Sequence, residues 1–316
     1  MFTAFPTLTY SRRYQVDKQP FLTYGVIDAS GQVVHSTPVP LRFGQMMHDF
    51  SITEHHAIFW DLPLEFSPMV MVSEDKLPFV YNKAKGARFG LLPRRACGES
   101  VRWFDLPGCM IFHSLGAWEE EDGQRVRLFA CRLEDFSLDL APASGSQAPR
   151  TVDAGSPTLF EFVFNLQTGE ATQSCVVPLP LGCTGMDFPR AHPALVGRRI
   201  RYGWLSLFAG IEITGVAKVD LETRQIVGRI NFPPGASGSE ILFVPRREGA
   251  PAPGKEDDGF LLTYVSMPAA SALWIMDAHT MAVQPLAVVD LPQRVPYGFH
   301  ATYVTTAQLA TQQAPQ

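Results

Sequence analysis

The sequence has no long hydrophobic run. Nowhere in its 316 residues do about 18 or more apolar residues follow one another, so no stretch is expected to cross a membrane as a helix. Charge is scarce as well, since only 18% of the residues are charged and the net charge is −5. Proteins that bind nucleic acid usually carry a basic excess. A nucleic-acid partner is therefore not expected.

Cysteine is sparse, and its spacing forms no recognisable motif. The five cysteines are odd in number and include no Cys-x-x-Cys pair. A disulfide framework would be unusual in a chain of this length, so we expect a reducing, intracellular compartment and cysteines that act as small buried hydrophobes. The first residues, MFTAFPTLTYSRRYQ, lack the basic region and apolar stretch of a secretory signal.

Proline and glycine, by contrast, are plentiful, and the chain alternates between strands and turns. Helical periodicity is sparse. Four segments share one pattern, in which an apolar strand ends in Asp or Asn, a polar turn follows, and a second strand ends near a proline: 21–38, 159–178, 215–232 and 273–291. Repeated hairpins of this kind are typical of propeller blades, which have about 40–50 residues each. The sequence therefore predicts an all-β propeller.

The strand pattern continues through residues 1–306, which we expect to form a single domain. Segments rich in Ser, Pro, Gly and Gln are expected to be unstructured, namely residues 141–156, 246–258 and the tail at 307–316. Neither internal segment marks a domain boundary, because the strand repeat resumes on both sides.

Three histidines lie in separate apolar, strand-like stretches: His48 in FGQMMHDFSIT, His113 in GCMIFHSLGAW and His300 in RVPYGFHATYV. An imidazole flanked by Met, Phe and Ile is expected to face a walled cavity rather than solvent. Residues so far apart can meet only if the fold brings distant strands to one centre, where imidazoles could hold Zn, Cu, Fe or Ni. Three separate, hydrogen-bonded core histidines are the alternative.

The remaining histidines are expected to be structural. Neighbouring residues of a strand point to opposite faces, so His55 and His56 should not share an ion. The charge run at residues 119–123 is typical of a solvated hairpin end. Three further histidines are interpreted as strand or surface residues: His35, His192 and His279.

Each of the three histidines in apolar stretches belongs to a longer motif, and other motifs lie between them. In chain order these are MMHDFSITE (46–54) with FWDLPL (59–64), FH (112–113) with AWEE (117–120), MDFPR (186–190) with GRRIRYG (197–203), SE (239–240) with FVP (243–245), EDDG (256–259), and PYGFHA (296–301). Over about residues 20–305 this ordered set resembles the carotenoid cleavage oxygenase family, which includes plant carotenoid dioxygenases and a related retinoid isomerase. Gly116 departs from it, because an Asn is usual there.

The resemblance implies an all-β, seven-bladed β-propeller with a central site in which four histidines hold Fe(II). His48, His113 and His300 match the second, third and fourth of these ligands. Carboxylates that accept the other ring N–H of a ligand fix its orientation. Glu240 matches one such carboxylate and Asp187 another, although the family usually has Glu at the second position. The shorter Asp187 could reach its histidine directly or only through water.

The first ligand has no counterpart, because residues 1–19 contain no histidine. We therefore interpret the chain as a family member that lacks its N-terminal portion, and hence as an incomplete propeller. Losing a ligand should loosen the ion at least as much as losing a residue that orients a ligand. Little activity is expected from the chain as printed.

By resemblance, the chain is an Fe(II) dioxygenase that uses O₂ to cleave one double bond of a carotenoid or apocarotenoid, giving aldehyde or ketone products. Aromatic residues near the histidines would line a tunnel for the polyene or belong to the core: Phe50, Phe59, Trp60, Phe112, Trp118 and Phe299. The alternative is a non-catalytic propeller remnant that binds a hydrophobic ligand or a protein partner. A soluble or membrane-peripheral protein is expected, in a plastid if the source is photosynthetic.

Overall fold

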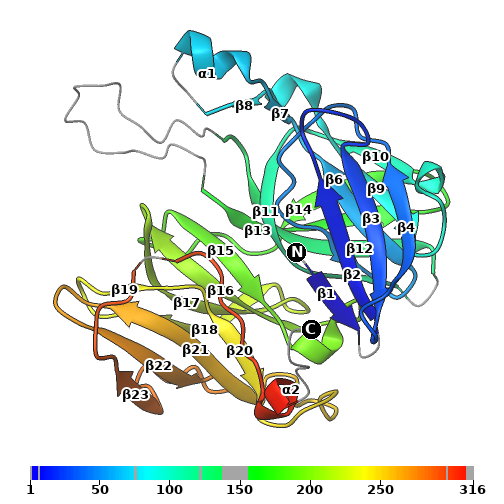
Figure 1. Ribbon diagram of the computed structural model, residues 1–316. Coiled ribbons are helices and arrows are strands. Elements are labelled where there is room, and N and C mark those ends of the chain that lie inside the picture. The colour runs from blue at the N-terminus through cyan, green and yellow to red at the C-terminus, as the bar shows by residue number, and fades with distance from the viewer. Residues whose placement is uncertain are drawn as a thin grey trace.

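The computed structural model describes residues 2–5, 8–74, 77–120, 123–136, 156–296 and 298–310. Within these ranges, antiparallel sheets are arranged around a common centre (Figure 1). Residues 141–155 of one segment expected to be unstructured, and residues 311–316 of the tail, lie outside the described residues.

Five sheets of the described chain have the form of propeller blades, and we number them in chain order. Blade 1 contains β1 (Phe2–Phe5), β2 (Leu8–Tyr14), β3 (Leu22–Asp28) and β4 (Val33–Val39). Blade 2 contains β5 (Ser51–Ile52), β6 (His56–Asp61), β9 (Ala87–Pro93) and β10 (Arg102–Leu106). Blade 3 contains β11 (Met110–Glu119), β12 (Arg125–Leu133), β13 (Thr158–Asn165) and β14 (Ala171–Cys175).

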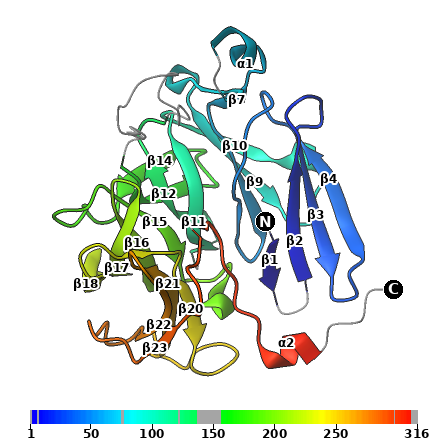
Figure 2. The ribbon, with the colours of Figure 1, turned by 60° about the vertical axis from the view of Figure 1, so that its left-hand side comes forward.

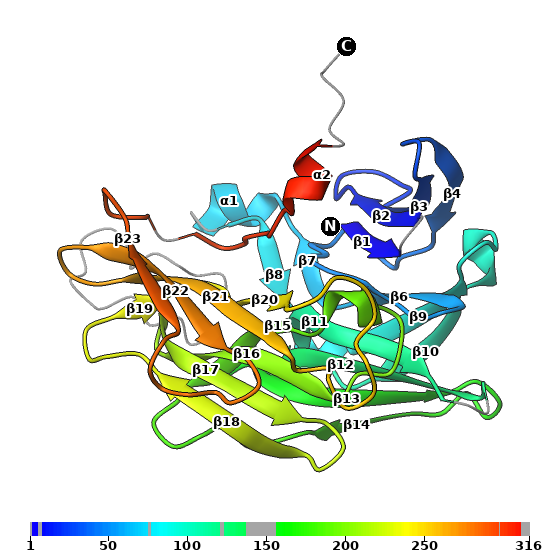
Figure 3. The same ribbon diagram turned by 90° about the horizontal axis from the view of Figure 1, so that it is seen from below.

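Blade 4 contains β15 (Gly185–Arg190), β16 (Tyr202–Ala209), β17 (Glu212–Asp220) and β18 (Gln225–Asn231). Blade 5 contains β19 (Ser237–Gly238), β20 (Leu242–Pro245), β21 (Gly259–Ser266), β22 (Ser271–Asp277) and β23 (Ala287–Asp290). Seen from below, blades 1 and 5 stand at the two ends of an arc of sheets (Figure 3).

The remaining elements are short. A two-stranded sheet is formed by β7 (Leu64–Phe66) and β8 (Phe79–Tyr81). The helices are α1 (Met69–Glu74) and α2 (Thr306–Ala310), and single 3₁₀ turns are η1 (Lys83–Lys85), η2 (Gly98–Ser100) and η3 (Pro193–Leu195). In the described part of the chain, neither helix has the length and apolar character needed to span a membrane.

One turn design recurs in the four predicted hairpins. The strand before each turn ends in Asp28, Asn165, Asp220 or Asp277, and the Oδ1 atom of that residue accepts backbone N–H groups two to four residues later. A short side chain that satisfies the turn's own amides replaces the hydrogen bonds lost where the ladder stops. The Asp or Asn at each strand end therefore fixes where the blade turns back.

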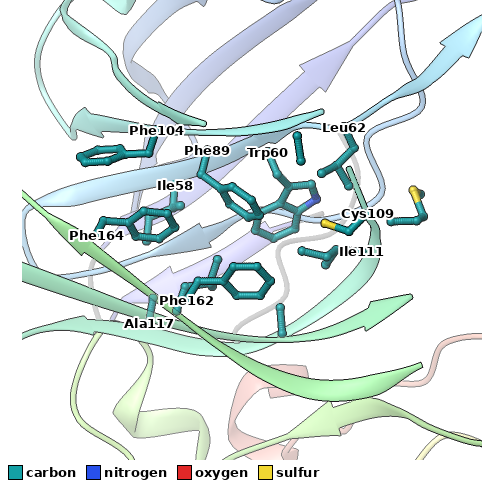
Figure 4. Close-up of a cluster of buried hydrophobic side chains, with 14 of the residues drawn as sticks. Ile58, Trp60, Leu62, Phe89, Phe104, Cys109, Ile111, Ala117, Phe162 and Phe164 are labelled. Carbon is teal, nitrogen blue, oxygen red and sulfur yellow. The ribbon is translucent and has the colours of Figure 1, made fainter. Parts of the chain in front are cut away.

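Buried side chains fill the space between neighbouring blades. Figure 4 shows the aromatic cluster between blades 2 and 3, in which the ring centroids of Phe89 and Phe162 lie 4.9 Å apart. Trp60 belongs to this cluster, and Phe50 and Phe59 pack in the cluster between blades 1 and 2. Each blade buries its apolar face against the next. Phe59 and Trp60 are therefore core rather than tunnel lining, whereas Phe50, although buried, also borders a cavity.

The segment 246–258 was expected to be unstructured; it contains no helix or strand, but the prediction is wrong for Glu256 and Asp257. The carboxylate of Glu256 accepts the backbone N–H groups of Arg201 and Tyr202 at 2.9 Å. Asp257 is 4% exposed, and its Oδ2 atom lies 2.6 Å from Nζ of the buried Lys218. The composition of the segment did not indicate these contacts, because they depend on partners in blade 4 that lie far away in the sequence.

The tail differs from expectation too, because α2 includes residues 307–310. The backbone N–H of Thr305 donates to the Gln308 side chain at 2.8 Å, and the N–H of Gln308 donates back to the Thr305 hydroxyl at 3.1 Å. This reciprocal pair is a capping box, which starts a helix. The Thr-x-x-Gln spacing was the overlooked signal.

The cysteines are all free, but Cys97 and Cys175 are exposed rather than buried.

Glu119 is not part of a solvated hairpin end. Its side chain is 11% exposed, and its oxygens lie 2.6 Å from Nδ1 of His55 and 2.9 Å from Nδ1 of His56. Thr53 also donates to it. His55 lies in a turn rather than in a strand, so both rings can face the same carboxylate. Glu119 thereby links blade 2 to blade 3.

The buried ion pair of Lys218 and Asp257 yields the first prediction. Replacing Lys218 with Met leaves a buried carboxylate without its cation, and we expect a loss of roughly 3–5 kcal/mol in the free energy of unfolding. The double variant Lys218→Met/Asp257→Asn should lose much less, because no unpaired charge remains. Urea denaturation of both variants measures this. Additive losses in the double variant would contradict the pairing.

A second prediction concerns acid stability. Burial acts to raise the pKa of Glu119, but hydrogen bonds from His56, Thr53 and His55 lower it from 4.5 to about 2. A lowered carboxyl pKa stabilises the fold above the unfolded value and loses that effect as the pH falls through the folded value. Glu119→Gln should therefore lower the melting temperature at neutral pH, and the gap to the parent should narrow between about pH 4.5 and pH 2. A constant gap would contradict this assignment.

Candidate metal centre

Three histidines from distant parts of the chain meet at the centre of the molecule. His48 lies in the loop before β5, His113 lies on β11, and His300 lies in the segment after β23. One ring nitrogen of each lies within 4.8 Å of those of the other two. Figure 2 shows the C-terminal segment, in red, passing β11 before it reaches α2. The structure thus brings together the residues that the sequence singled out.

His113 is oriented by Asp187. The Nδ1 atom of His113 lies 3.0 Å from Oδ1 of Asp187, so the contact is direct and needs no water. Burial acts to lower the pKa of His113, but the hydrogen bond and charge of Asp187 outweigh it, and the pKa is raised. An ionised carboxylate can only accept, so Nδ1 carries the proton. The other nitrogen, Nε2, is buried and has no hydrogen-bond partner among the described residues.

His48 follows the same rule with a different acceptor. Its Nδ1 atom lies 3.2 Å from the carbonyl oxygen of Phe112, the residue before His113. A carbonyl oxygen is also only an acceptor, so Nδ1 of His48 carries the proton. Burial, followed by repulsion from His113, lowers the pKa of His48 and favours its neutral form. Its Nε2 atom then presents a lone pair.

His300 is held by Glu240. Its Nδ1 atom lies 3.3 Å from both oxygens of that carboxylate, and the backbone N–H of Ala301 donates to Glu240 Oε2 at 2.9 Å. The Nε2 atoms of His300 and His48 lie 3.5 Å apart. In all three rings, Nδ1 therefore donates its proton to an acceptor, and Nε2 is the nitrogen that can bind a ligand at the centre of the cluster. Lone pairs that face one another repel unless a cation lies between them, so this donor set fits a metal ion.

Irregularities in two strands place the side chains of His113 and Asp187 at the histidine cluster. The ladder of β11 shifts register between Ile111 and Ser114, around His113, and that of β15 shifts between Asp187 and Arg190. Phe188 adopts φ 51°, a conformation that is costly for a side-chain-bearing residue, and its ring centroid lies 4.7 Å from that of His113. Bulges of this kind redirect side chains next to functional sites.

Asp49 is a contributor that sequence reasoning missed. It is 4% exposed, and its Oδ2 atom accepts the backbone N–H of Ser114 at 2.9 Å and the Ser114 hydroxyl at 2.8 Å. Because Asp49 follows His48 and Ser114 follows His113, this contact joins the two ligand-bearing segments. The sequence feature that could have indicated this role is an acidic residue directly after a candidate ligand, His48.

The other five histidines all bind elsewhere. His55 and His56 contact Glu119. His35 contacts the carbonyl oxygen of Ala96, His192 accepts the backbone N–H of Ala194, and His279 contacts Asp257. The expectation that His192 lies at the surface is wrong, because it is 3% exposed and caps η3. Among the described residues, the cluster therefore contains three histidines.

A cavity of about 920 Å³ lies beside the cluster. Its wall includes the residues that follow the three histidines in sequence: Asp49, Ser114 and Ala301. The aromatic residues nearest the rings are Phe112, 5.5 Å from His48 between ring centroids, and Phe188. The three imidazoles are therefore bordered by aromatic rings, and the residue after each of them in sequence lines the cavity.

The family model described as retinal pigment epithelial membrane protein matches residues 7–305. Two carotenoid 9,10(9′,10′)-cleavage dioxygenases are similar: one from Pisum sativum is 40% identical over 309 residues, and one from Arabidopsis thaliana is 41% identical over 311. Each alignment covers 93% of this chain and 55% of the relative. The chain thus spans about half the length of these relatives.

Solved structures agree with the fold. Cobalt-substituted Synechocystis apocarotenoid oxygenase has a TM-score of 0.80 at 22% identity, covering 95% of this chain and 61% of that one. The lignostilbene dioxygenase of Pseudomonas brassicacearum has a TM-score of 0.79 at 22% identity, covering 95% and 65%. The predicted class, an all-β fold of the seven-bladed propeller type, is confirmed. The chain belongs to the carotenoid cleavage oxygenase family, the family of the retinal pigment epithelial membrane protein.

Proposed function

We propose that this chain serves the oxidative cleavage of a carotenoid or apocarotenoid, with Fe(II) held by His48, His113 and His300. The observation that carries the proposal is the convergence of three imidazoles whose Nδ1 atoms are all committed to acceptors. The names of the related dioxygenases supply the reaction class. Fe(II), when bound, supplies the redox chemistry by which O₂ and one C=C bond become two carbonyl groups.

The protein's own part is to hold the ligands and to exclude competing partners. Asp187 and Glu240 keep the Nδ1 protons of His113 and His300 turned away from the centre, which fixes the tautomer of each ring. Burial of His113, at 9% exposure, keeps water from its Nε2 atom. Neutral imidazoles leave the full positive charge on the ion, unlike sites that include a carboxylate ligand.

An apolar substrate fits the surroundings of the cluster. Phe112 and Phe188 contact the histidine rings, and Phe299, next to His300, is 80% exposed. Aromatic faces bind conjugated, apolar molecules through stacking and burial. A polyene that reaches the histidines would pass these rings, so we assign carotenoids or apocarotenoids, together with O₂, as the substrates.

We also propose that α1 contacts a membrane. No residue of α1 is buried, and Met69, Met71 and Val72 are 70%, 52% and 84% exposed. Exposed apolar side chains grouped on one short element mark an interaction site. Carotenoids dissolve in membranes, so this contact would bring the site to its substrate.

The related 9-cis-epoxycarotenoid dioxygenase of rice is named as chloroplastic, which supports a plastid location if the source is photosynthetic.

Metal binding tests the ligand assignment. Titration of the purified chain with Fe(II) under anaerobic conditions should show one site, and His113→Ala should abolish it. Asp187→Asn should weaken binding by about 10–100-fold, as losses of ligand-orienting residues do. Glu222→Gln, which changes an exposed carboxylate that pairs with Arg199, is the matched control and should bind like the parent. Unchanged binding by His113→Ala would remove this histidine from the site.

Product analysis tests the activity. The chain, Fe(II), O₂ and an apocarotenoid should give little aldehyde, because three histidines replace the family's four. A fusion to the part of the Pisum sativum dioxygenase that this chain does not align with should raise the yield at least 10-fold, because it would add a fourth histidine ligand. Full cleavage by the chain alone would show that three histidines suffice. Iron binding without cleavage by either form would favour the alternative, a non-catalytic propeller that binds a hydrophobic ligand.

Vesicle flotation tests the membrane contact. The chain should float with liposomes, and Met69→Ser/Met71→Ser/Val72→Ser should remain in solution, because exposed apolar surface drives the association. A matched control is Val33→Ser/Val34→Ser, which changes exposed apolar residues on the edge strand β4. Equal flotation of the triple variant and the parent would exclude α1 as the contact.

A further inference from the structure

His300 has the weakest structural support of the three histidines. His113 lies within a blade strand, whereas His300 lies in the irregular segment between β23 and α2, and its side chain is 38% exposed. Upstream, this segment is tied to blade 5 through the Val295 amide, which donates to Ser271. At His300, the Nδ1 atom of the ring and the following backbone amide, that of Ala301, both bind Glu240. The position of His300 therefore depends on what fixes Glu240.

Glu240 is 4% exposed, and a buried carboxylate has to be paired with a cation and with hydrogen-bond donors. The partner is Arg190, whose Nη2 atom donates to Glu240 Oε1. Its Nε atom also donates to the carbonyl oxygen of Ile241 at 3.3 Å. The guanidinium thus binds both the carboxylate and the backbone beside it.

Arg190 reaches this position because of the irregularity in β15. The register shift between Asp187 and Arg190 includes Phe188 in its left-handed conformation. One end of this four-residue segment binds His113 through Asp187, and the other binds His300 through Arg190 and Glu240. A single bulge on blade 4 therefore sets two of the three imidazoles relative to each other.

We propose that Arg190 is a positioning residue for the metal centre, and that it holds His300 through Glu240. The inference rests on the proposed function in taking the cluster as a metal site. Arg190 supplies no ligand atom to the cluster. Its effect comes from holding the Glu240 carboxylate and the backbone beside it in place. Lysine can supply the charge but not the planar pair of donors, so the Lys variant should restore part of the effect.

Cobalt binding is the first test, because Co(II) reports ligand number in its visible spectrum without turnover. The parent, Arg190→Gln and Arg190→Lys are titrated with Co(II). We expect at least 10-fold weaker binding and an altered spectrum for Arg190→Gln, with intermediate affinity for Arg190→Lys. The matched control is Arg246→Gln, which removes a guanidinium bound to Asp258 and Asp277 and should leave the spectrum unchanged. Parental affinity and spectrum in Arg190→Gln would overturn the inference.

Hydrogen exchange of the metal-free chain is the second test and does not depend on the proposed function. The amide of Ala301 donates to Glu240, so its exchange should be faster in Arg190→Gln than in the parent and Arg246→Gln. If the parent binds no cobalt, the proposed function fails, but this exchange rate still decides whether Arg190 holds the segment. Equal rates would overturn the inference. If Arg190→Gln does not fold, Arg190→Lys carries both tests, with smaller changes in the same directions.

Discussion

The centre of this molecule depends on three hydrogen bonds that point away from it. Each imidazole in the cluster gives its Nδ1 proton to a fixed acceptor: the Phe112 carbonyl, Asp187 or Glu240. These bonds determine the tautomer, and the tautomer leaves an unprotonated Nε2 atom on each ring. The acceptors lie in different blades, so the relative placement of the blades becomes the geometry of the site.

The blades can hold such a geometry because their interfaces are packed with large side chains. Aromatic clusters such as Phe89 with Phe162 leave little freedom for one blade to slide against the next. Polar links add direction to this packing, as Asp49 does between the His48 loop and β11, and Glu119 between blades 2 and 3. The described residues on either side of His300 are mostly exposed, and the His300 ring is held by polar contacts such as that with Glu240.

Sequence reasoning succeeded where the signal was local. The strand ends at Asp28, Asn165, Asp220 and Asp277 predicted the turns, since an Asp or Asn side chain satisfies amides within a few residues of itself. It failed where a side chain found a distant partner. Glu119 was interpreted as part of a solvated run, although it binds two histidines from another blade.

The sequence by itself determined the family, the strand and turn rhythm and the three histidines, because each is written in contiguous motifs. Tertiary structure alone decided that Asp187 reaches His113 directly, that Asp257 pairs with Lys218, and that Arg190 binds Glu240. The physical reason is common to all three. A hydrogen bond between residues 39 to 74 positions apart depends on blade packing and on local bulges, which leave no periodic trace in the chain.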